Sequence, residues 1–535
     1  MKDRARMIKS ISRGAGVMIA ALTASTVLGE VASAQSAPKG TLRFVVESLG
    51  NEVLDPILGS PSATKLYLPL MYDSLIGADE TNSDISKETG VAKDWKISDD
   101  GKAYTFYLRQ GIKFHNGEDL TAEDVKFTFE RATGSRSTSA LSGVLRKVIE
   151  RITVDDPYTI TIQLREPKFS FLFDISALVS SDSMIVPKNY IRQVGDEKFA
   201  VAPIGSGPYR LKRHVAGSAV EFEAMPKHWS IGVPKFAEFH MIGIPEQGAR
   251  LTMLNGEEAD VISVGRRYVE GLQKNGFLIN TKLAGNQSML LINNQWDKNS
   301  PLNDRRVRNA IALAIDSKVI LAKLMLGSGV LTRCWVTDVA YSARPAGLCD
   351  PLPYDPKAAR QLLTEAGYPN GIDITFRSYA FPGIPEKLEV DQAIAGYLHA
   401  VGIRAKVEVG EFGAYRAQWP QPESLPNTIA NNPTLSQIVI GSLVHTFFSA
   451  EGLLSVTRGV NPRADAAIGR MLQAATLDEY KQRLMEAWAA LLEEHNVVML
   501  FSIDAKFAAN PKKVDKLWPM GTSTADLGLR FLVRQ

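Results

Sequence analysis

The sequence predicts a protein of mixed strands and helices, an α/β fold, that is divided into more than one lobe. Period-two strand patterns and helical stripes of apolar residues both occur along the chain. Removal of an expected leader leaves about 500 residues, which is more than one hydrophobic core usually serves. We therefore expect two or three lobes. The formal net charge of +3 over 535 residues gives no indication of a nucleic-acid surface.

The N-terminus has the three parts of a secretory signal peptide. Basic residues come first, an apolar run follows from Gly14 to Leu28, and Ala32-Ser33-Ala34 forms a cleavage sequence. This run is too short for a membrane span and ends at the cleavage sequence. We expect residues 1–34 to be removed, with no lipid anchor because no cysteine follows. The expected product is exported to the periplasm and soluble.

Cys334 and Cys349 are the two cysteines of the chain. In an oxidising compartment, an even pair at this short separation predicts a disulfide. The alternatives are a metal site or a redox thiol. Both are less favoured because no second ligand pair and no C-x-x-C motif accompany the cysteines.

The strands and helices of the first half can be taken in order. Thr41–Val46 is expected to be a buried first strand, and Leu66–Ile76 to contain a helix. The alternation in Tyr104–Leu108 predicts a half-buried strand. Thr121 is the expected N-cap of the next helix, with Asp124 in the position of a short capping box. Further expected elements are an edge strand at Tyr158–Leu164, a helix at Gln247–Leu254 and a strand at Ala259–Val261.

The second half gives similar patterns. Asp304 or Asn303 can cap a helix whose apolar stripe runs from Val307 to Ile315. Asp355 is the expected N-cap of another helix, with Pro356 at its first position. The remaining expected elements are strands at Met289–Asn293, Ile372–Phe376 and Val497–Ile503, a helix capped by Thr476 and Glu479, and a surface loop at Pro420–Pro433.

The stretch Lys102–Arg131 closely resembles the signature of the family 5 solute-binding proteins, the extracytoplasmic receptors of peptide- and nickel-type ABC importers. The residues that fit the signature are Arg109, Gly111, Phe114, His115, Gly117, Thr121, Ala122, Asp124 and Val125. Pro203–Tyr209 resembles a second family segment, Gly-Thr-Gly-Pro-Tyr, with Ser206 in place of Thr. The resemblance extends over nearly all of residues 40 to 505.

This resemblance implies a type II-like periplasmic binding protein. Such a protein has two lobes joined by two crossing strands, with an extra subdomain inserted in lobe I, and it encloses its ligand when the lobes close by a hinge motion. The implied boundaries are 35–290 for lobe I, with the inserted subdomain at about 60–190, 291–500 for lobe II, and 501–535 for the return to lobe I.

The implied function is a receptor that captures a small polar solute and delivers it to the transmembrane subunits of an ABC permease. The solute would be peptide-like, an opine or a sugar-acid conjugate. The receptor would be a monomer in peripheral contact with the membrane complex. The alternatives are a nickel or metal-chelate receptor of the same family, a sensor or chaperone that feeds no importer, and a secreted hydrolase whose triad assembles only in space. No catalytic motif is recognisable, so we expect no enzyme and no cofactor.

The resemblance also implies where the ligand lies. In peptide-binding relatives, a carboxylate of lobe II pairs with the α-ammonium of the ligand. The corresponding segment here, Gly441–Leu454, contains no Asp. His445 and Thr446 fall at that position, where a His would favour an anionic solute, although His445 could equally be a plain loop residue.

Residues from both lobes complete the expected site. Arg377 could clamp a carboxylate of the ligand, or it could form a structural salt bridge. Glu47 could take over the amine-binding role, and Trp419 is a candidate lid. The expected ligand-binding residues are Glu47, Ser48, Leu49, Arg377, Tyr379, Trp419, His445, Thr446, Phe447 and Phe448.

Overall fold

The computed structural model contains one compact unit that spans Ala37–Gln535. The structure describes residues 37–50, 52–58, 66–79, 84–137, 141–179, 181–336, 341–419, 421, 425–435, 439–452, 454–518, 520 and 528–534. The expected signal peptide, residues 1–34, lies outside the described residues. Within the described ranges, no helix combines the length and the apolar character that a membrane span requires.

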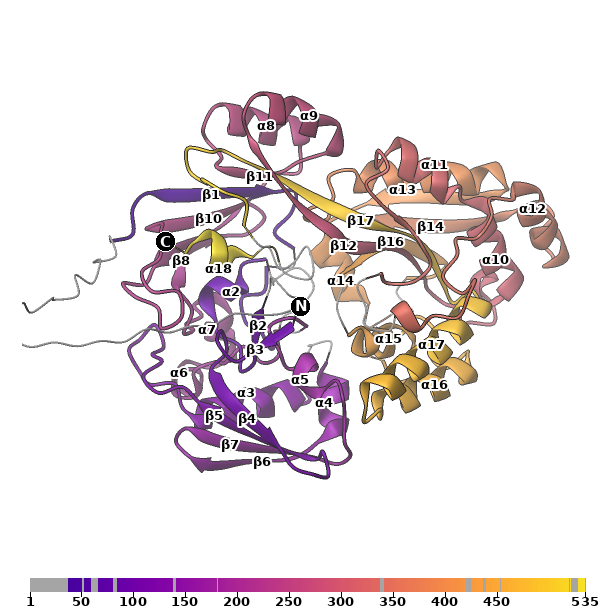
Figure 1. Cartoon of the computed structure of the whole chain (residues 1–535). Coiled ribbons are helices and arrows are strands. Elements are labelled where there is room, and N and C mark those ends of the chain that lie inside the picture. Colours follow the sequence, from indigo (N-terminus) through magenta and orange to yellow (C-terminus); the bar gives the residue numbers. More distant parts are fainter. Residues whose placement is uncertain are drawn as a thin grey trace, which may run out of the picture. The chain divides into compact units, whose positions relative to one another are not determined.

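A large mixed sheet continues through both halves of the chain (Figure 1). Its strands follow the order β15 (Ile403–Val409), β14 (Ile372–Ser378), β16 (Thr428–Leu435), β12 (Leu278–Ile292), β17 (Val497–Ala509), β11 (Val261–Ser263), β1 (Thr41–Val46), β10 (Glu238–Gly243), β9 (Ala219–Ala224) and β8 (Tyr209–Val215), and β13 (Gly329–Leu331) pairs with β17. The expected strands at the start of the chain, after Gly371 and near Val497 are therefore confirmed.

Two long strands, β12 and β17, cross from one half to the other. They pair with each other antiparallel. β17 also pairs with β11 at one end, and β12 also pairs with β16 at the other end. The pairing register shifts between Lys282 and Asn286, and such an irregularity locally disrupts the ladder. The expected crossings at Met289–Asn293 and Val497–Ile503 lie in or at the end of these two strands.

Buried apolar side chains form separate cores on the two sides of this crossing. One core consists of residues between Met289 and Ile503, and we call this part lobe II. The cores around β1, β10 and β11 also include residues that follow Ile503, and we call this part lobe I. A further core between Ile57 and Ile185 belongs to the inserted subdomain of lobe I. The fold is thus the α/β architecture that the sequence predicts, with two lobes, two crossing strands and an inserted subdomain.

The inserted subdomain is built on a second sheet. Its order is β4 (Ala92–Ile97), β5 (Ala103–Leu108), β7 (Thr159–Leu164) and β6 (Ile149–Asp156). The prediction that Tyr158–Leu164 forms an edge strand is wrong, because β7 lies between β5 and β6. Its alternation arises because one face of this sheet covers the subdomain core, whereas the other face is partly open to solvent.

The helices that the sequence predicts are all present, together with others that it did not predict. Lobe I with its inserted subdomain contains α2 (Leu68–Met71), α3 (Ala122–Thr133), α4 (Ser142–Val148), α5 (Phe171–Asp174), α6 (Lys188–Val194), α7 (Asp196–Val201), α8 (Gln247–Asn255), α9 (Arg266–Lys274) and α18 (Leu529–Leu532), and a small hairpin of β2 (Gly77–Asp79) and β3 (Asp84–Ser86). Lobe II contains α10 (Arg305–Ala314), α11 (Ser317–Lys323), α12 (Pro356–Glu365), α13 (Lys387–Ala400), α14 (Phe412–Gln418), α15 (Gly441–Phe448), α16 (Pro462–Leu472) and α17 (Leu477–Glu493), with 3-10 turns at Pro301–Asn303 and Tyr341–Ala343. Asp304, Asp355 and Thr476 each accept a backbone N–H as N-caps, which confirms those three predictions.

The prediction of a surface loop at Pro420–Pro433 is wrong for its second half. Thr428–Leu435 forms β16, which pairs with both β12 and β14 inside the large sheet. Asn431 and Asn432 are buried there and hydrogen-bond to other side chains. Asn and Pro are normally depleted from strands, so composition alone indicated a loop.

The signature stretch joins the inserted subdomain to the rest of lobe I. The His115 N–H donates to the Gly205 carbonyl over 2.8 Å, and the Gly205 N–H donates to His115 Nδ1 over 3.2 Å. A Cβ atom on Gly205 would lie 2.0 Å from the Met71 carbonyl oxygen, so only Gly fits. Asp124 caps α3 by accepting from the Thr121 N–H over 2.9 Å. Residues of the family signature therefore connect the inserted subdomain with the rest of lobe I.

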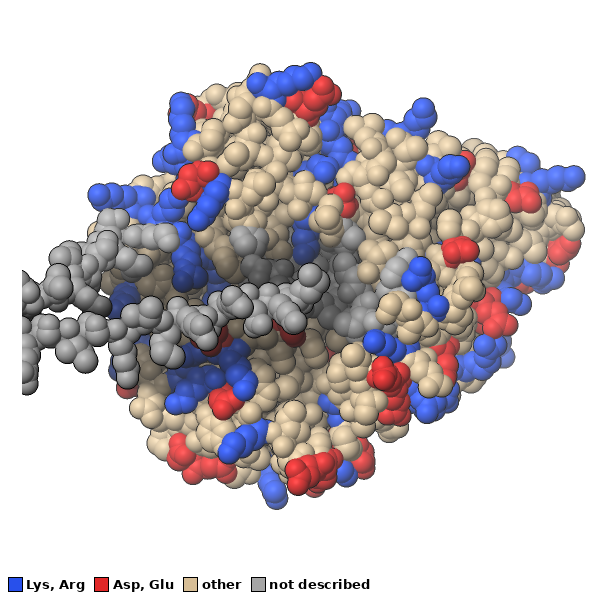
Figure 2. All heavy atoms as spheres, viewed as in Figure 1, with Lys and Arg blue, Asp and Glu red and all other residues tan. Residues whose placement is uncertain are grey.

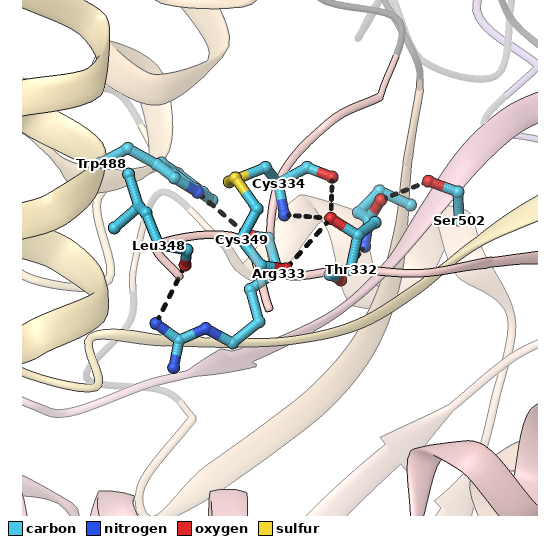
Figure 3. The surroundings of a disulfide bond; sticks show 8 residues. Thr332, Arg333, Cys334, Leu348, Cys349, Trp488 and Ser502 are labelled. Carbon is cyan, nitrogen blue, oxygen red and sulfur yellow. Dashed lines mark hydrogen bonds between the residues drawn. A yellow bond between two sulfur atoms is a disulfide. The ribbon is translucent and has the colours of Figure 1, made fainter. Parts of the chain in front are cut away.

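The predicted disulfide is confirmed, with an S–S distance of 2.02 Å between Cys334 and Cys349 (Figure 3). Its surroundings tie the loop to lobe II. The Trp488 indole donates to the Arg333 carbonyl over 2.9 Å, and Cys334 N–H donates to the Thr332 hydroxyl over 3.0 Å. The Thr332 carbonyl in turn accepts from Gln287 of β12. The bridge therefore stabilises the connection between α17 and a crossing strand.

Replacing both cysteines by Ser should lower the free energy of unfolding by about 3 kcal/mol, because the bridge closes a loop with a sequence separation of 15. Urea unfolding of the double variant, followed by circular dichroism, measures this loss. The wild type under reducing conditions should reproduce it. An unchanged unfolding midpoint in both samples would show that the bridge does not constrain the unfolded chain.

Candidate functional site

The carboxyl ends of parallel strands from both lobes meet at one place. In lobe I, β1 runs parallel to β10 and β11, and Glu47 follows β1 directly. In lobe II, β14 runs parallel to β15 and β16, and the segment Tyr379–Glu386 follows β14. Ligands of open α/β sheets bind outside the carboxyl ends of the strands. The region between these two edges is therefore the candidate site.

Glu47 links the two lobes at this point. One of its oxygens accepts from the Ser263 hydroxyl over 2.7 Å and from Arg250 over 3.3 Å, both within lobe I. The other oxygen accepts from the Gly383 N–H of lobe II over 3.0 Å. The carboxylate that the sequence analysis offered as an amine-binding group is thus already held by a cation, a hydroxyl and an amide of the protein.

A second contact between the lobes lies beside Glu47. Arg266, at the start of α9, forms a buried ion pair with Glu386 over 2.6 Å. The Arg266 N–H also donates to Glu386, over 2.7 Å, and its guanidinium donates to the carbonyl of Asp504 on β17. Arg266 therefore connects lobe I, lobe II and a crossing strand.

A buried polar cluster lies at the lobe II edge. Lys387, the first residue of α13, pairs with Asp391 over 2.5 Å. Asp391 also accepts from the Ser378 hydroxyl over 2.6 Å and from the Asn431 amide over 2.8 Å. Burial lowers the pKa of Lys387 and raises that of Asp391, and the charge of each partner opposes this effect. The pair thus connects α13 with the end of β14 and with the middle of β16.

Tyr379 connects this cluster to an aromatic wall. Its hydroxyl donates to the Asn432 side chain over 2.7 Å, and the Lys387 ammonium lies 4.0 Å from its ring centre. The other members of the wall are Phe381, Phe412, Tyr415, Trp419 and Phe447. Contacts among these rings and that of Tyr379 have centroid distances of 4.9–6.4 Å. Polar and apolar surfaces thus adjoin at one edge of lobe II, as in many small-molecule sites.

The inserted subdomain contacts lobe II at α15. The Ser442 hydroxyl of α15 donates to Asp174 over 2.8 Å, and Asp174 pairs with Lys168 over 3.1 Å. The Phe169 N–H donates to the Ala474 carbonyl over 2.8 Å, and the Phe169 ring packs against Tyr480. The inserted subdomain and lobe II are therefore in direct contact at this point.

His445 lies buried on α15, in the segment that contacts the inserted subdomain. Burial lowers its pKa to about 4, and the charges of Lys147 and Lys168 act in the same direction, so the imidazole is neutral at pH 7. The expectation that His445 lies on a loop is wrong, because α15 is a helix. Thr446 donates to the Ser442 carbonyl over 2.9 Å and thus supports the same helix.

The other expected site residues divide between the site and the core. Arg377 pairs with Glu408 of the neighbouring strand β15 over 2.9 Å, which is the structural salt bridge named as its alternative role. Leu49 packs into the core of lobe I, and Phe448 packs against Trp488 in lobe II. Ser48 accepts from the Gly50 N–H within its own turn. The structure brings together Glu47 with Gly383, and Tyr379 with Trp419 and Phe447.

Sequence reasoning missed the buried charges of the site. Lys387 and Asp391 lie four residues apart on one helix, which reads as a solvated i,i+4 pair. Asn431 and Asn432 fall in a segment that reads as a loop. Lys168 and Asp174 follow Glu166-Pro167 without any motif. In the sequence, the adjacent Asn431 and Asn432 were the one feature that could have indicated this buried polar cluster.

Charges of both signs are interspersed over lobe II on the face drawn in Figure 2, without a patch of one sign. Among the described residues, no group of three or more His, Cys, Asp or Glu side chains could hold a metal ion.

Comparisons with known proteins find relatives in sequence and in fold. The family described as bacterial extracellular solute-binding proteins, family 5 Middle, matches residues 88–427. A glutathione-binding protein, GsiB of Salmonella paratyphi A, is 29% identical over 398 residues, which cover 73% of this chain and 74% of that protein.

Two solved structures share the fold. The periplasmic binding protein DppA from Helicobacter pylori, in complex with the peptide STSA, has a TM-score of 0.80 at 22% identity, over 93% of this chain and 98% of that chain. The binding protein MoaA from A. tumefaciens R10, in complex with mannopinic acid, has a TM-score of 0.79 at 21% identity, over 92% and 99% of the two chains.

Proposed function

Because the chain belongs to family 5 of the bacterial extracellular solute-binding proteins, we propose that it captures a small polar solute between lobes I and II and delivers it to the permease of an ABC importer. The observation that carries this proposal is the meeting of the carboxyl ends of β1, β11 and β14, where polar and aromatic side chains gather. Peptide-like compounds, opines and sugar-acid conjugates are the proposed solutes. The names of the relatives, which bind glutathione, a peptide and mannopinic acid, support this range.

Hinge motion about β12 and β17 is the proposed route of entry. Family membership supports such a motion, and so do the separate cores of the two lobes and the register shift between Lys282 and Asn286. We place the boundaries at 35–290 with an inserted subdomain at about 60–190, at 291–500, and at 501–535. The contacts of Glu47 and Asp174 with lobe II would then form when the lobes close.

The protein is proposed to act as a periplasmic monomer without a lipid anchor, after removal of residues 1–34. The family is one of binding proteins, and the described residues of the candidate site supply hydrogen bonds and stacking surfaces. The proposed contacts to the solute come from Tyr379, Trp419, His445 and Phe447; the ring contacts among the aromatic residues and the place of His445 and Phe447 on α15 support this choice.

Trp419→Ala should weaken solute binding about tenfold or more, since buried aromatic anchors dominate the binding energy of such sites. Trp419 packs against Phe412, Tyr415 and Phe447, so the substitution removes the middle of the wall. Isothermal titration with the solute gives the dissociation constant. Trp95→Ala on β4 is the matched control, because Trp95 belongs to the inserted subdomain's sheet and lies apart from the wall. Equal solute affinities of the two variants would show that Trp419 does not contribute to solute binding.

Native mass spectrometry of the purified mature protein, followed by denaturing release, tests the proposed function. The expected result is a bound small solute, or a rise in melting temperature with a member of a solute panel, because a ligand that binds only the folded state stabilises it. A protein that carries nothing and is stabilised by no peptide, opine or sugar acid would contradict the proposal.

A further inference from the structure

The segment Lys168–Asp174 of the inserted subdomain contacts lobe II, and we call it the contact segment. Its Phe169 N–H donates to the Ala474 carbonyl over 2.8 Å, and its Asp174 carboxylate accepts from the Ser442 hydroxyl over 2.8 Å. Asp174 and Ser442 are 268 residues apart in sequence. Because the crossing strands β12 and β17 join the lobes elsewhere, a separation of the lobes breaks these bonds.

The aromatic rings of the contact segment point into different cores. Phe171 is fully buried in the core of the inserted subdomain, and its ring centre lies 4.8 Å from that of Tyr104. Phe169 packs against the core of lobe II instead, with its ring centre 5.7 Å from that of Tyr480. Phe173 packs against both cores. The inserted subdomain thus contributes apolar surface to the other lobe, and water would cover this surface if the lobes separated.

Asp174 carries the polar part of the same contact. It is fully buried and pairs with Lys168 over 3.1 Å. The Ser442 hydroxyl donates to one oxygen of its carboxylate over 2.8 Å, and the Ser170 hydroxyl donates to the other over 2.9 Å. Ser170 belongs to the contact segment, whereas Ser442 lies on α15 of lobe II, the helix that also carries two of the proposed solute contacts.

We propose that the contact segment holds part of the solute-free molecules closed, and that Phe169 and Asp174 thereby raise the affinity for the solute without touching it. The ring packing and the two hydrogen bonds join protein groups only, so they stabilise the closed form before a solute binds. A solute that binds the closed form gains affinity when a larger fraction of the protein is already closed. This inference rests on the proposed function, and it makes Phe169 and Asp174 positioning residues.

Distance measurement on the solute-free protein tests the proposal. Spin labels on Glu150→Cys of β6 and Lys357→Cys of α12 occupy exposed positions of the inserted subdomain and of lobe II. The two native cysteines are bonded to each other, so only the introduced thiols react. Double electron–electron resonance should give two distances, a shorter one for the closed form and a longer one for the open form.

Phe169→Ala should lower the ratio of closed to open molecules about fivefold or more, because it removes the ring that packs on lobe II. Leu172→Ala is the matched control, since Leu172 packs against the core of its own subdomain, and the ratio should stay within about twofold of the wild type. A single distance in the wild type, an unchanged ratio in Phe169→Ala, or equal changes in both variants would overturn the proposal. Because no solute is present, this result is independent of the mass-spectrometric test of the proposed function.

A second pair of variants tests the part of Asp174. Ser442→Ala and Ser170→Ala each remove one hydroxyl that donates to this carboxylate, but only the first removes a bond between the lobes. We expect the ratio of closed to open molecules to fall about three- to tenfold in Ser442→Ala and to stay within about twofold in Ser170→Ala. Melting temperatures establish that both variants fold. Equal ratios in the two variants would show that Asp174 does not hold the lobes together.

Discussion

Lys387→Met is expected to lower the free energy of unfolding by about 3–5 kcal/mol, because it leaves a fully buried carboxylate without its cation. Asp391 and Lys387 are both less than 2% exposed, and their atoms lie 2.5 Å apart. The Ser378 and Asn431 side chains would still donate to Asp391, but neither carries a charge. The loss should also disturb the end of β14 and the middle of β16 and thereby weaken solute binding.

The double variant with Lys387→Met and Asp391→Leu distinguishes the effect of an unpaired buried charge on stability from the effect of altered packing. Replacing both members of a buried pair by apolar residues is often neutral or stabilising. We therefore expect the double variant to recover most of the lost unfolding free energy in urea titrations. Its solute affinity should remain reduced, because Asn431 loses an acceptor that orients it. A double variant less stable than Lys387→Met would contradict this account of the pair.

Asp73→Ala should cost about 3–5 kcal/mol of unfolding free energy for a similar reason. The buried carboxylate accepts from Arg530 over 2.7 Å, from the Trp229 indole over 2.9 Å and from the Ser206 hydroxyl over 2.8 Å, and it also contacts His228. Burial raises the pKa of Asp73, but His228 and Arg530 more than offset this effect, so the pKa falls below its ordinary range. The carboxylate is therefore ionised in the folded protein.

Differential scanning calorimetry and urea titration measure this loss. Asp73→Asn keeps the size of the side chain and part of its hydrogen bonding, so it should fall between the wild type and Asp73→Ala. Asp84→Ala on β3 is the matched control, because Asp84 lies on an exposed hairpin of the same lobe. Equal unfolding free energies for Asp73→Ala and Asp84→Ala would show that Asp73 does not hold α18 against the rest of lobe I.

Local patterns predicted part of the helices and strands, and those helices lie where they were expected. The N-caps Asp304, Asp355 and Thr476 are confirmed because each depends on residues within one turn of the chain. The position of β7 inside its sheet could not be predicted, because strand order depends on residues far apart in sequence. α18 was missed as well, since its anchor Arg530 contacts Asp73 across a sequence separation of 457 residues.

Only part of the candidate site could be predicted, because the partners of its charged side chains are distant in sequence. The resemblance led to Glu47, Tyr379, Trp419 and the α15 segment, all of which lie where the lobes meet or on the aromatic wall. Whether Glu47 is available to a ligand depends on Arg250, which lies 203 residues further along the chain. A short segment shows which polar and charged side chains are present. Their hydrogen-bond and ion-pair partners lie far away in the sequence and are known only from the tertiary structure.

The most direct test of the central claim is small-angle X-ray scattering of the mature protein with and without the solute identified by mass spectrometry. If the solute is captured between lobes that close about β12 and β17, the radius of gyration should decrease when the solute saturates the protein. The wild type should show this decrease in full, and Trp419→Ala should show it only at higher solute concentrations. A solute that saturates the protein while the scattering curve stays unchanged would contradict capture by lobe closure.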